Sequence, residues 1–256
     1  MDASTHLTHL ENYAVLLGAN ARAAGVDAAV PSCPGWTVGE LVAHTSVVHR
    51  HKTAIVAGQL VEESAPIPAR PDGDVLEWYD EGVAEMMATF ANADLSLPTW
   101  TWCDHQHAAE WWVRRMAHET AIHGADAVLA NDGVASVDDA LAEDGVDELL
   151  DEMMVGGPVW STVDHGDRRI DLVAGDRRWS LRTASFSGTA PGSGEQYESI
   201  ATVVFDDAGK PDAVVGTDGG TLDLWLWGRG PLGVEDTSGD ADLVSHLRGI
   251  AADVTQ

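Results

Sequence analysis

The chain has 256 residues, with 42 acidic and 14 basic side chains, which give a formal net charge of -28 with the histidines neutral. Nucleic acids and anionic membrane surfaces attract stripes of lysine and arginine. The sequence contains two lysines, Lys52 and Lys210, so neither surface is an expected partner. An apolar fraction of 45% is that of a globular chain.

The length allows one large or two modest domains. The sequence starts without an apolar signal region, and no stretch is long and apolar enough to cross a bilayer, so we expect a cytoplasmic protein. Cys33 and Cys103 are too few for a disulfide framework and are expected to be reduced thiols. The strong negative charge disfavours close self-association, which points to a monomer or a weak homodimer.

Helical periodicity dominates the first part of the chain. Apolar residues at three- and four-residue steps predict four helices, which span about 7–25, 37–58, 74–90 and 108–130. Thr37 and Glu40 form an S/T-x-x-E capping box at the start of the second helix. Four long helices favour a bundle. A further acidic helix, 138–154, precedes Gly156 and Gly157, so we place the domain boundary between residues 155 and 156.

The remaining residues, 156–256, have an α/β pattern. Short β-prone runs are separated by turn signals, and they span 170–173, 179–184, 200–205 and 213–215. The 222–227 segment is ambiguous, because its leucines alternate as in a strand while Thr221 and Gly228 suit helix ends. A closing helix is expected over 240–252, and the Ser187–Gly194 stretch is expected to be a mobile loop. The predicted fold class is α+β.

One helix carries a spacing typical of metal ligands. Glu119 and His123 are four residues apart and differ by about 40° around a helix, so they project from the same face. His118 and His123 differ by about 140° and cannot hold one metal together. His44, on the inward stripe of the second helix, is the best third ligand. A His-Glu-His set with an open fourth position resembles catalytic zinc coordination.

Alternatives to this site remain open on spacing alone. A core histidine beside a surface ion pair would give the same Glu/His spacing, and Cys103, His105 and His107 could form a separate cluster. Asp126 is either an acceptor for the His123 ring or a surface carboxylate. His49 and His51 are expected near the solvent-facing end of their helix, and the tryptophans at 36, 102, 111 and 112 in the core.

Two motifs resemble those of the mycothiol-dependent maleylpyruvate isomerase family. They are Pro34-Gly35-Trp36-Thr37-Val38-Gly39-Glu40-Leu41-Val42-Ala43-His44 and Trp111-Trp112-Val113-Arg114-Arg115-Met116-Ala117-His118-Glu119-Thr120-Ala121-Ile122-His123. A third segment, Leu222 to Arg229, looks like the second domain of that family. The resemblance implies a DinB-like four-helix bundle over residues 1–155 and a smaller, sterol-carrier-like α/β domain over 156–256, in which Leu222 begins a short helix.

The resemblance also implies a site. His44, Glu119 and His123 match the divalent metal ligands of the family, usually of zinc, and Arg229 matches an essential arginine of the second domain. Mycothiol is the implied cosubstrate. The family often shows Arg-Trp after the second ligand histidine, whereas this chain has Gly124-Ala125, a loss of bulk and charge that bears on the substrate pocket.

The function implied is that of a metal- and mycothiol-dependent isomerase or S-transferase acting on a small electrophile. In the isomerase reaction the thiolate adds to a conjugated cis double bond, the new single bond rotates, and elimination returns the trans isomer. Arg229 would stabilise the enolate formed on addition. The alternative is a non-catalytic metal- or small-molecule-binding protein of the DinB superfamily.

Overall fold

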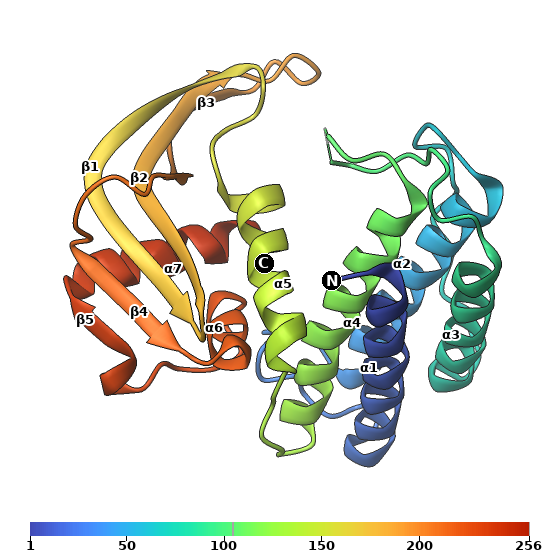
Figure 1. The fold of residues 1–256 in the computed structure, drawn as a ribbon. Coiled ribbons are helices and arrows are strands. Elements are labelled where there is room, and N and C mark those ends of the chain that lie inside the picture. The colour runs from blue at the N-terminus through green and yellow to red at the C-terminus, as the bar shows by residue number, and fades with distance from the viewer. Residues whose placement is uncertain (104, 256) are drawn as a thin grey trace. The chain divides into compact units, whose positions relative to one another are not determined.

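The computed structural model describes residues 1–103 and 105–255. The chain forms two compact units, Met1–Val137 and Asp138–Gln256, whose elements are labelled in Figure 1. The first unit is helical and the second combines helices with one sheet, as the α+β prediction requires. The division lies before the acidic helix and not after it, because that helix packs against a helix of the second unit. Among the described residues, no helix is long and apolar enough to cross a membrane.

Four helices make up the first unit. They are α1 (Ala3–Ala24), α2 (Val38–Gly58), α3 (Val75–Asn92) and α4 (Ala109–Ala130). The predicted helix bounds agree closely with these. Helix α1 ends at Gly25, whose φ of 87° lies in the left-handed region that glycine adopts without strain. Helix α4 packs along α1, and α2 along α3.

The start of α2 is held by the predicted capping box. The Glu40 amide donates to the Thr37 hydroxyl over 3.3 Å, and the Thr37 amide donates to the Glu40 carboxylate over 2.6 Å. The Thr37 amide thereby gains an acceptor, and the Glu40 amide, which also donates to the Thr37 carbonyl over 3.0 Å, gains a second one. This cap fixes the helix that carries His44.

Replacing Thr37 with alanine is expected to destabilise the protein by about 1 kcal/mol, because the Glu40 amide loses its side-chain acceptor. Urea unfolding of both proteins measures the difference. Thr8→Ala, which removes an exposed hydroxyl in the middle of α1, is the matched control and should change the free energy of unfolding less. Equal effects of the two substitutions would contradict the capping role.

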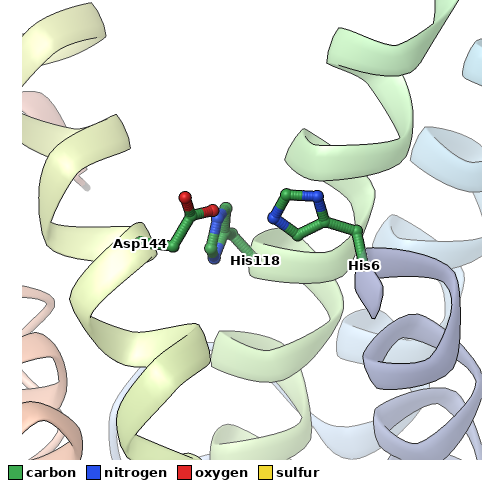
Figure 2. A group of neighbouring side chains, drawn as sticks. All are labelled: His6, His118 and Asp144. Atoms are coloured by element: carbon green, nitrogen blue, oxygen red, sulfur yellow. The ribbon is translucent and has the colours of Figure 1, made fainter. Parts of the chain in front are cut away.

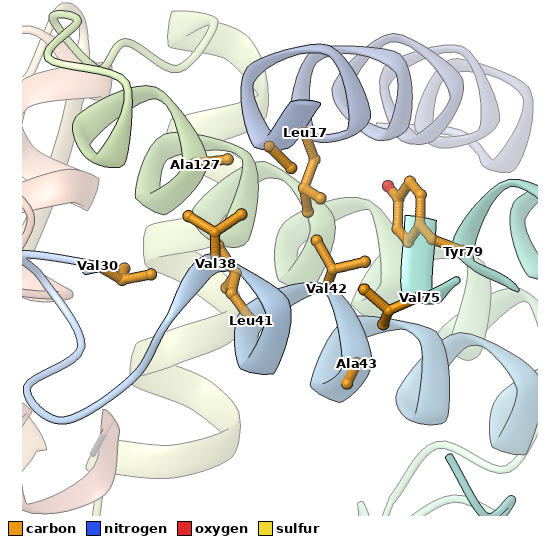
Figure 3. Close-up of a cluster of buried hydrophobic side chains, with 10 residues drawn as sticks. Leu17, Val30, Val38, Leu41, Val42, Ala43, Val75, Tyr79 and Ala127 are labelled. Carbon is orange, nitrogen blue, oxygen red and sulfur yellow. The ribbon is translucent and has the colours of Figure 1, made fainter. Parts of the chain in front are cut away.

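The core of the first unit lies where its helices converge (Figure 3). The Tyr79 ring of α3 packs beside Leu17 of α1 and Val42 of α2, and its hydroxyl donates to the Ala14 carbonyl over 3.0 Å. Ala127 joins the cluster from α4. The core therefore ties together all four helices, which gives the side chains on α2 and α4 a rigid support.

The second unit contains three α-helices and a five-stranded sheet. Its helices are α5 (Asp139–Leu149), continued by the π-helix η1 (Leu150–Met154), α6 (Gly219–Leu226) and α7 (Ala241–Thr255). Its strands are β1 (Ser161–Ala174), β2 (Arg177–Thr189), β3 (Gln196–Phe205), β4 (Ala213–Thr217) and β5 (Thr237–Gly239), and a short 3-10 helix, η2 (Val234–Asp236), precedes β5.

The sheet has the order β3-β2-β1-β4-β5. Strand β1 pairs antiparallel with β2 and parallel with β4, with Leu172 opposite Trp179 on one side and opposite Val215 on the other. These three side chains are buried, and α7 packs against β1, β4 and β5. One face of the sheet is therefore covered by helix.

Two sequence expectations for this unit need comment. The ambiguous 222–227 segment is helical, because Asp218 caps α6 by accepting from the Thr221 amide over 2.7 Å. The expectation of a loop over Ser187–Gly194 is wrong in part, since β2 continues to Thr189. The rest closes as a turn in which the Ala190 amide donates to the Glu195 carbonyl.

Candidate metal centre

Helices α2 and α4 bring His44, Glu119 and His123 together. Glu119 Oε1 lies 3.4 Å from His44 Nε2 and 3.2 Å from His123 Nε2. One ligand atom from each residue lies within 4.8 Å of the others. The one-turn spacing on α4 places Glu119 and His123 on the same face, and the capped α2 supplies the third side chain. The predicted trio thus converges on one point.

The two oxygens of Glu119 have different partners. Oε2 forms an ion pair with Arg115, one turn earlier on α4, while Oε1 faces the two imidazoles. Burial alone would raise the pKa of Glu119, but Arg115 and the hydrogen bonds from His123 and His44 hold it well below its usual range. Glu119 is therefore a carboxylate with one oxygen directed at the centre. The sequence analysis did not identify Arg115, although the i,i+4 spacing to Glu119 signals such a pair.

The other ring nitrogen of His123 is held by a buried carboxylate. Nδ1 lies 2.9 Å from Asp126 Oδ2, and Asp126 is fully buried, so Asp126 is an acceptor for this ring and not a surface residue. Burial lowers the pKa of His123, but Asp126 and Glu119 outweigh it and raise the pKa to about 9. Without a metal, a charged imidazolium therefore balances the two carboxylates.

His44 lies on the open side of the centre. Its side chain is 41% exposed, against 11% for His123 and 15% for Glu119, so the ring of His44, predicted on the inward stripe of its helix, is partly open to solvent. The Trp36 ring flanks this side, with its centroid 5.0 Å from that of His44 and 6.4 Å from that of His123. A small molecule can approach the centre from the solvent side of His44.

The donor set fits a divalent transition metal ion. Two imidazole nitrogens and one carboxylate oxygen are typical zinc ligands, and three protein ligands leave a position for water or substrate. The second nitrogen of His123 is already bonded to a carboxylate, as is usual for metal-binding histidines. The residues present therefore fit a divalent metal ion with one open position.

Comparison with known proteins identifies the helical domain. Residues 7–128 match the family model described as the mycothiol maleylpyruvate isomerase N-terminal domain. The first unit of the chain therefore carries the N-terminal domain of this family.

Solved structures show the same fold over most of the chain. Two of them are the mycothiol-dependent maleylpyruvate isomerase and a point mutant of it. Both are 12% identical to this chain, and each match covers 90% of both chains, with TM-scores of 0.55 and 0.59. No curated protein matches this sequence. The comparisons therefore give the family of the helical domain and the fold of the chain.

His118 precedes Glu119 on α4, but its ring contacts His6. Its ring packs edge-on against that of His6 from α1, with 5.8 Å between the centroids (Figure 2). Among the described residues, His118 and His123 lie in different groups of possible metal ligands, in line with the angle between them around the helix. His118 is a packing residue between α1 and α4.

The expectation for His49 and His51 was wrong, because both side chains are buried. His49 Nε2 lies 2.8 Å from the Thr120 hydroxyl on α4, and His51 Nε2 lies 3.2 Å from the Ala65 carbonyl. Helix α2 is covered by α3, α4 and the following loop, so few of its positions face solvent. Neither residue belongs to the metal centre.

The alternative cluster of Cys103, His105 and His107 is only partly assembled. Cys103 Sγ lies 3.4 Å from His105 Nδ1. His107 Nδ1 is instead 3.5 Å from the Thr101 hydroxyl.

The predicted core positions of Trp111 and Trp112 are confirmed, whereas Trp102 is 40% exposed.

Arg229 lies in the second unit, just after α6. Its side chain is buried, and Nη1 donates to the Trp227 carbonyl over 2.5 Å. Burial, with the positive charge of Arg229 nearby, lowers the pKa of Arg248 on α7.

Gly124, which stands where the family often has arginine, packs against α1. A Cβ at this position would lie 3.6 Å from the Tyr13 ring of α1 and 3.7 Å from Leu16. The position thus faces α1, and its small size lets α1 and α4 approach closely. A bulky residue here would require the two helices to separate.

Proposed function

We propose that this protein is a metal- and mycothiol-dependent isomerase or S-transferase that acts on a small electrophile, in the manner of maleylpyruvate isomerase. The convergence of His44, Glu119 and His123 carries the proposal. The family assignment and the fold of the neighbouring structures support it. Zinc, or another divalent ion, and mycothiol are the implied cofactors.

His44 Nε2, Glu119 Oε1 and His123 Nε2 would hold the metal. When bound, a divalent ion supplies Lewis acidity that lowers the pKa of a coordinating thiol. Arg115 fixes Glu119 by binding its other oxygen. The exposed side of His44, beside Trp36, would admit the thiol and the electrophile.

Arg229 is proposed to bind the negative charge of the substrate. Addition of a thiolate to a conjugated carbonyl compound places charge on the carbonyl oxygen, and a guanidinium stabilises it. A positive group matters in this chain because its net charge of -28 repels anionic substrates.

Replacing Arg229 with alanine is expected to lower kcat/KM for an anionic electrophile by about 100-fold, as for other groups that stabilise developing charge. Zinc content should not change, because the metal ligands are on α2 and α4. Steady-state kinetics and elemental analysis measure the two quantities. Arg178→Ala, which removes an exposed arginine of β2, is the control. Unchanged kinetics in Arg229→Ala would contradict its role.

The proposal as a whole is tested with protein purified without chelators. Elemental analysis should find about one zinc or other divalent ion per chain. Calorimetry with mycothiol, followed by incubation with maleylpyruvate and mycothiol, should show thiol binding and either isomerisation or formation of a thioether adduct. Metal binding without any affinity for the thiol would instead favour a non-catalytic metal-binding protein.

A further inference from the structure

We propose that Ser32 and Cys33, in the loop between α1 and α2, are positioning residues that hold the His123 imidazole in its metal-binding orientation through Asp126. The inference rests on the metal centre of the proposed function. It assigns a role to a loop that supplies no ligand of its own.

Asp126 is the point where the loop meets the centre. Its Oδ2 lies 2.9 Å from His123 Nδ1 and 3.4 Å from Cys33 Sγ, while Oδ1 accepts from the Ser32 hydroxyl over 2.5 Å. A fully buried carboxylate is costly unless several donors satisfy it. Ser32 and Cys33 supply donors from a segment more than 90 residues away in the chain.

The loop is rigid enough to fix the carboxylate. The Val30 amide donates to the Trp36 carbonyl, the Cys33 amide to the Val30 carbonyl, and the Trp36 amide to the Cys33 carbonyl, over 3.0 to 3.1 Å. Ala29 and Thr37 form a β-bridge across its base. Ser32 and Cys33 are thus held between two ends that are both anchored.

The Asp126 carboxylate determines the tautomer and the orientation of the His123 ring. A carboxylate accepts and does not donate, so the hydrogen of the neutral ring resides on Nδ1 and Nε2 keeps its lone pair for a metal. The rotation of the ring is also fixed, because Asp126 is itself fixed by Ser32 and Cys33. Loss of such partner groups weakens metal binding by about 10–100-fold in other proteins.

The test measures the zinc dissociation constant by chelator competition in a set of full-length variants. Asp126→Asn is expected to weaken binding by about 10–100-fold. Ser32→Ala should weaken it less, and Cys33→Ser, which keeps a donor, should bind more tightly than Cys33→Ala. Ser46→Ala is the control, since this buried serine of α2 donates to the Val42 carbonyl and not to the centre.

The visible absorption spectrum of the cobalt-substituted protein reports on the geometry of the metal ligands, and a general loss of stability would not change it. The visible ligand-field bands of the cobalt protein should shift in Asp126→Asn and Ser32→Ala and stay unchanged in Ser46→Ala. Equal zinc affinities and identical cobalt spectra for the wild type, Asp126→Asn and Ser32→Ala would overturn the inference but not the proposed function. If the predicted affinity order appears without mycothiol binding, the inference stands and the proposed function fails.

Discussion

Replacing Glu119 with alanine is expected to abolish metal binding, with zinc content falling from about one ion per chain to near zero. Glu119 Oε1 is the atom shared by both imidazoles, at 3.4 Å and 3.2 Å. Its removal leaves two neutral nitrogen ligands and takes away the negative charge of the set. The loss should exceed the roughly 100-fold that partner groups cost, and thiol-dependent activity should disappear with the metal.

The control for this variant is Glu110→Ala, which removes an exposed carboxylate from the first turn of the same helix. Because Arg115 is buried and would lose its ion pair, Glu119→Ala is also expected to lower the free energy of unfolding. Circular dichroism at low temperature confirms that the helices persist. Glu119→Gln keeps the shape of the side chain, and full zinc occupancy in this variant would contradict the assignment of Glu119 as a ligand.

Much of the helical unit could be predicted because its signals are local. A capping box, a glycine stop and apolar spacing fix both ends of α2 and the C-terminal end of α1 within a residue or two, whereas α1 starts at Ala3, before the predicted start near residue 7. The Glu119 and His123 pair is likewise a local pattern, four residues apart on one helix. The assignment of His44 as third ligand needed both the stripe on α2 and the resemblance to the family.

The contacts that were missed are of two kinds. The Arg115 and Glu119 ion pair is local and was available from spacing. The contacts of Ser32 and Cys33 with Asp126 were not, because the loop has no periodicity and the partners are more than 90 residues apart. A single sequence carries no signal for such pairs.

The second unit shows where hydrophobic patterning fails. Strand β1 begins at Ser161, but its first half is polar and includes Asp164 and His165, so only the 170–173 run was recognised. The strand forms because β2 pairs with both of its ends, over Ser161 to His165 and again over Arg169 to Ala174, with an irregularity between them. The two compact units divide before Asp138, whereas the turn signals Gly156 and Gly157 that suggested the predicted boundary lie within the second unit.

His49 is expected to make the helical unit sensitive to acid. Its side chain is fully buried, Nε2 contacts the Thr120 hydroxyl, and Nδ1 has no hydrogen-bond partner among the described residues. Burial is the main cause that lowers the pKa of His49 to about 3, with His123 and His44 adding to the shift and Glu119 opposing it. The folded protein therefore strongly prefers the neutral ring.

Because the pKa of His49 is about 3 in the folded chain and near 6.5 in the unfolded chain, its neutral form costs no stability above pH 6.5. Below pH 6.5 His49 is protonated in the unfolded state but stays neutral in the folded state. The free energy of unfolding therefore falls by about 1.4 kcal/mol per pH unit until about pH 3. Urea unfolding at pH 7 and pH 4 gives the free energy of unfolding that each metal-free protein loses between the two pH values. This loss should be about 3 kcal/mol larger in the wild type than in His49→Gln. The exposed His246→Gln control should follow the wild type. Parallel pH dependence of the wild type and His49→Gln would show that the ring is charged in the folded protein, or that acid opens the bundle before His49 titrates.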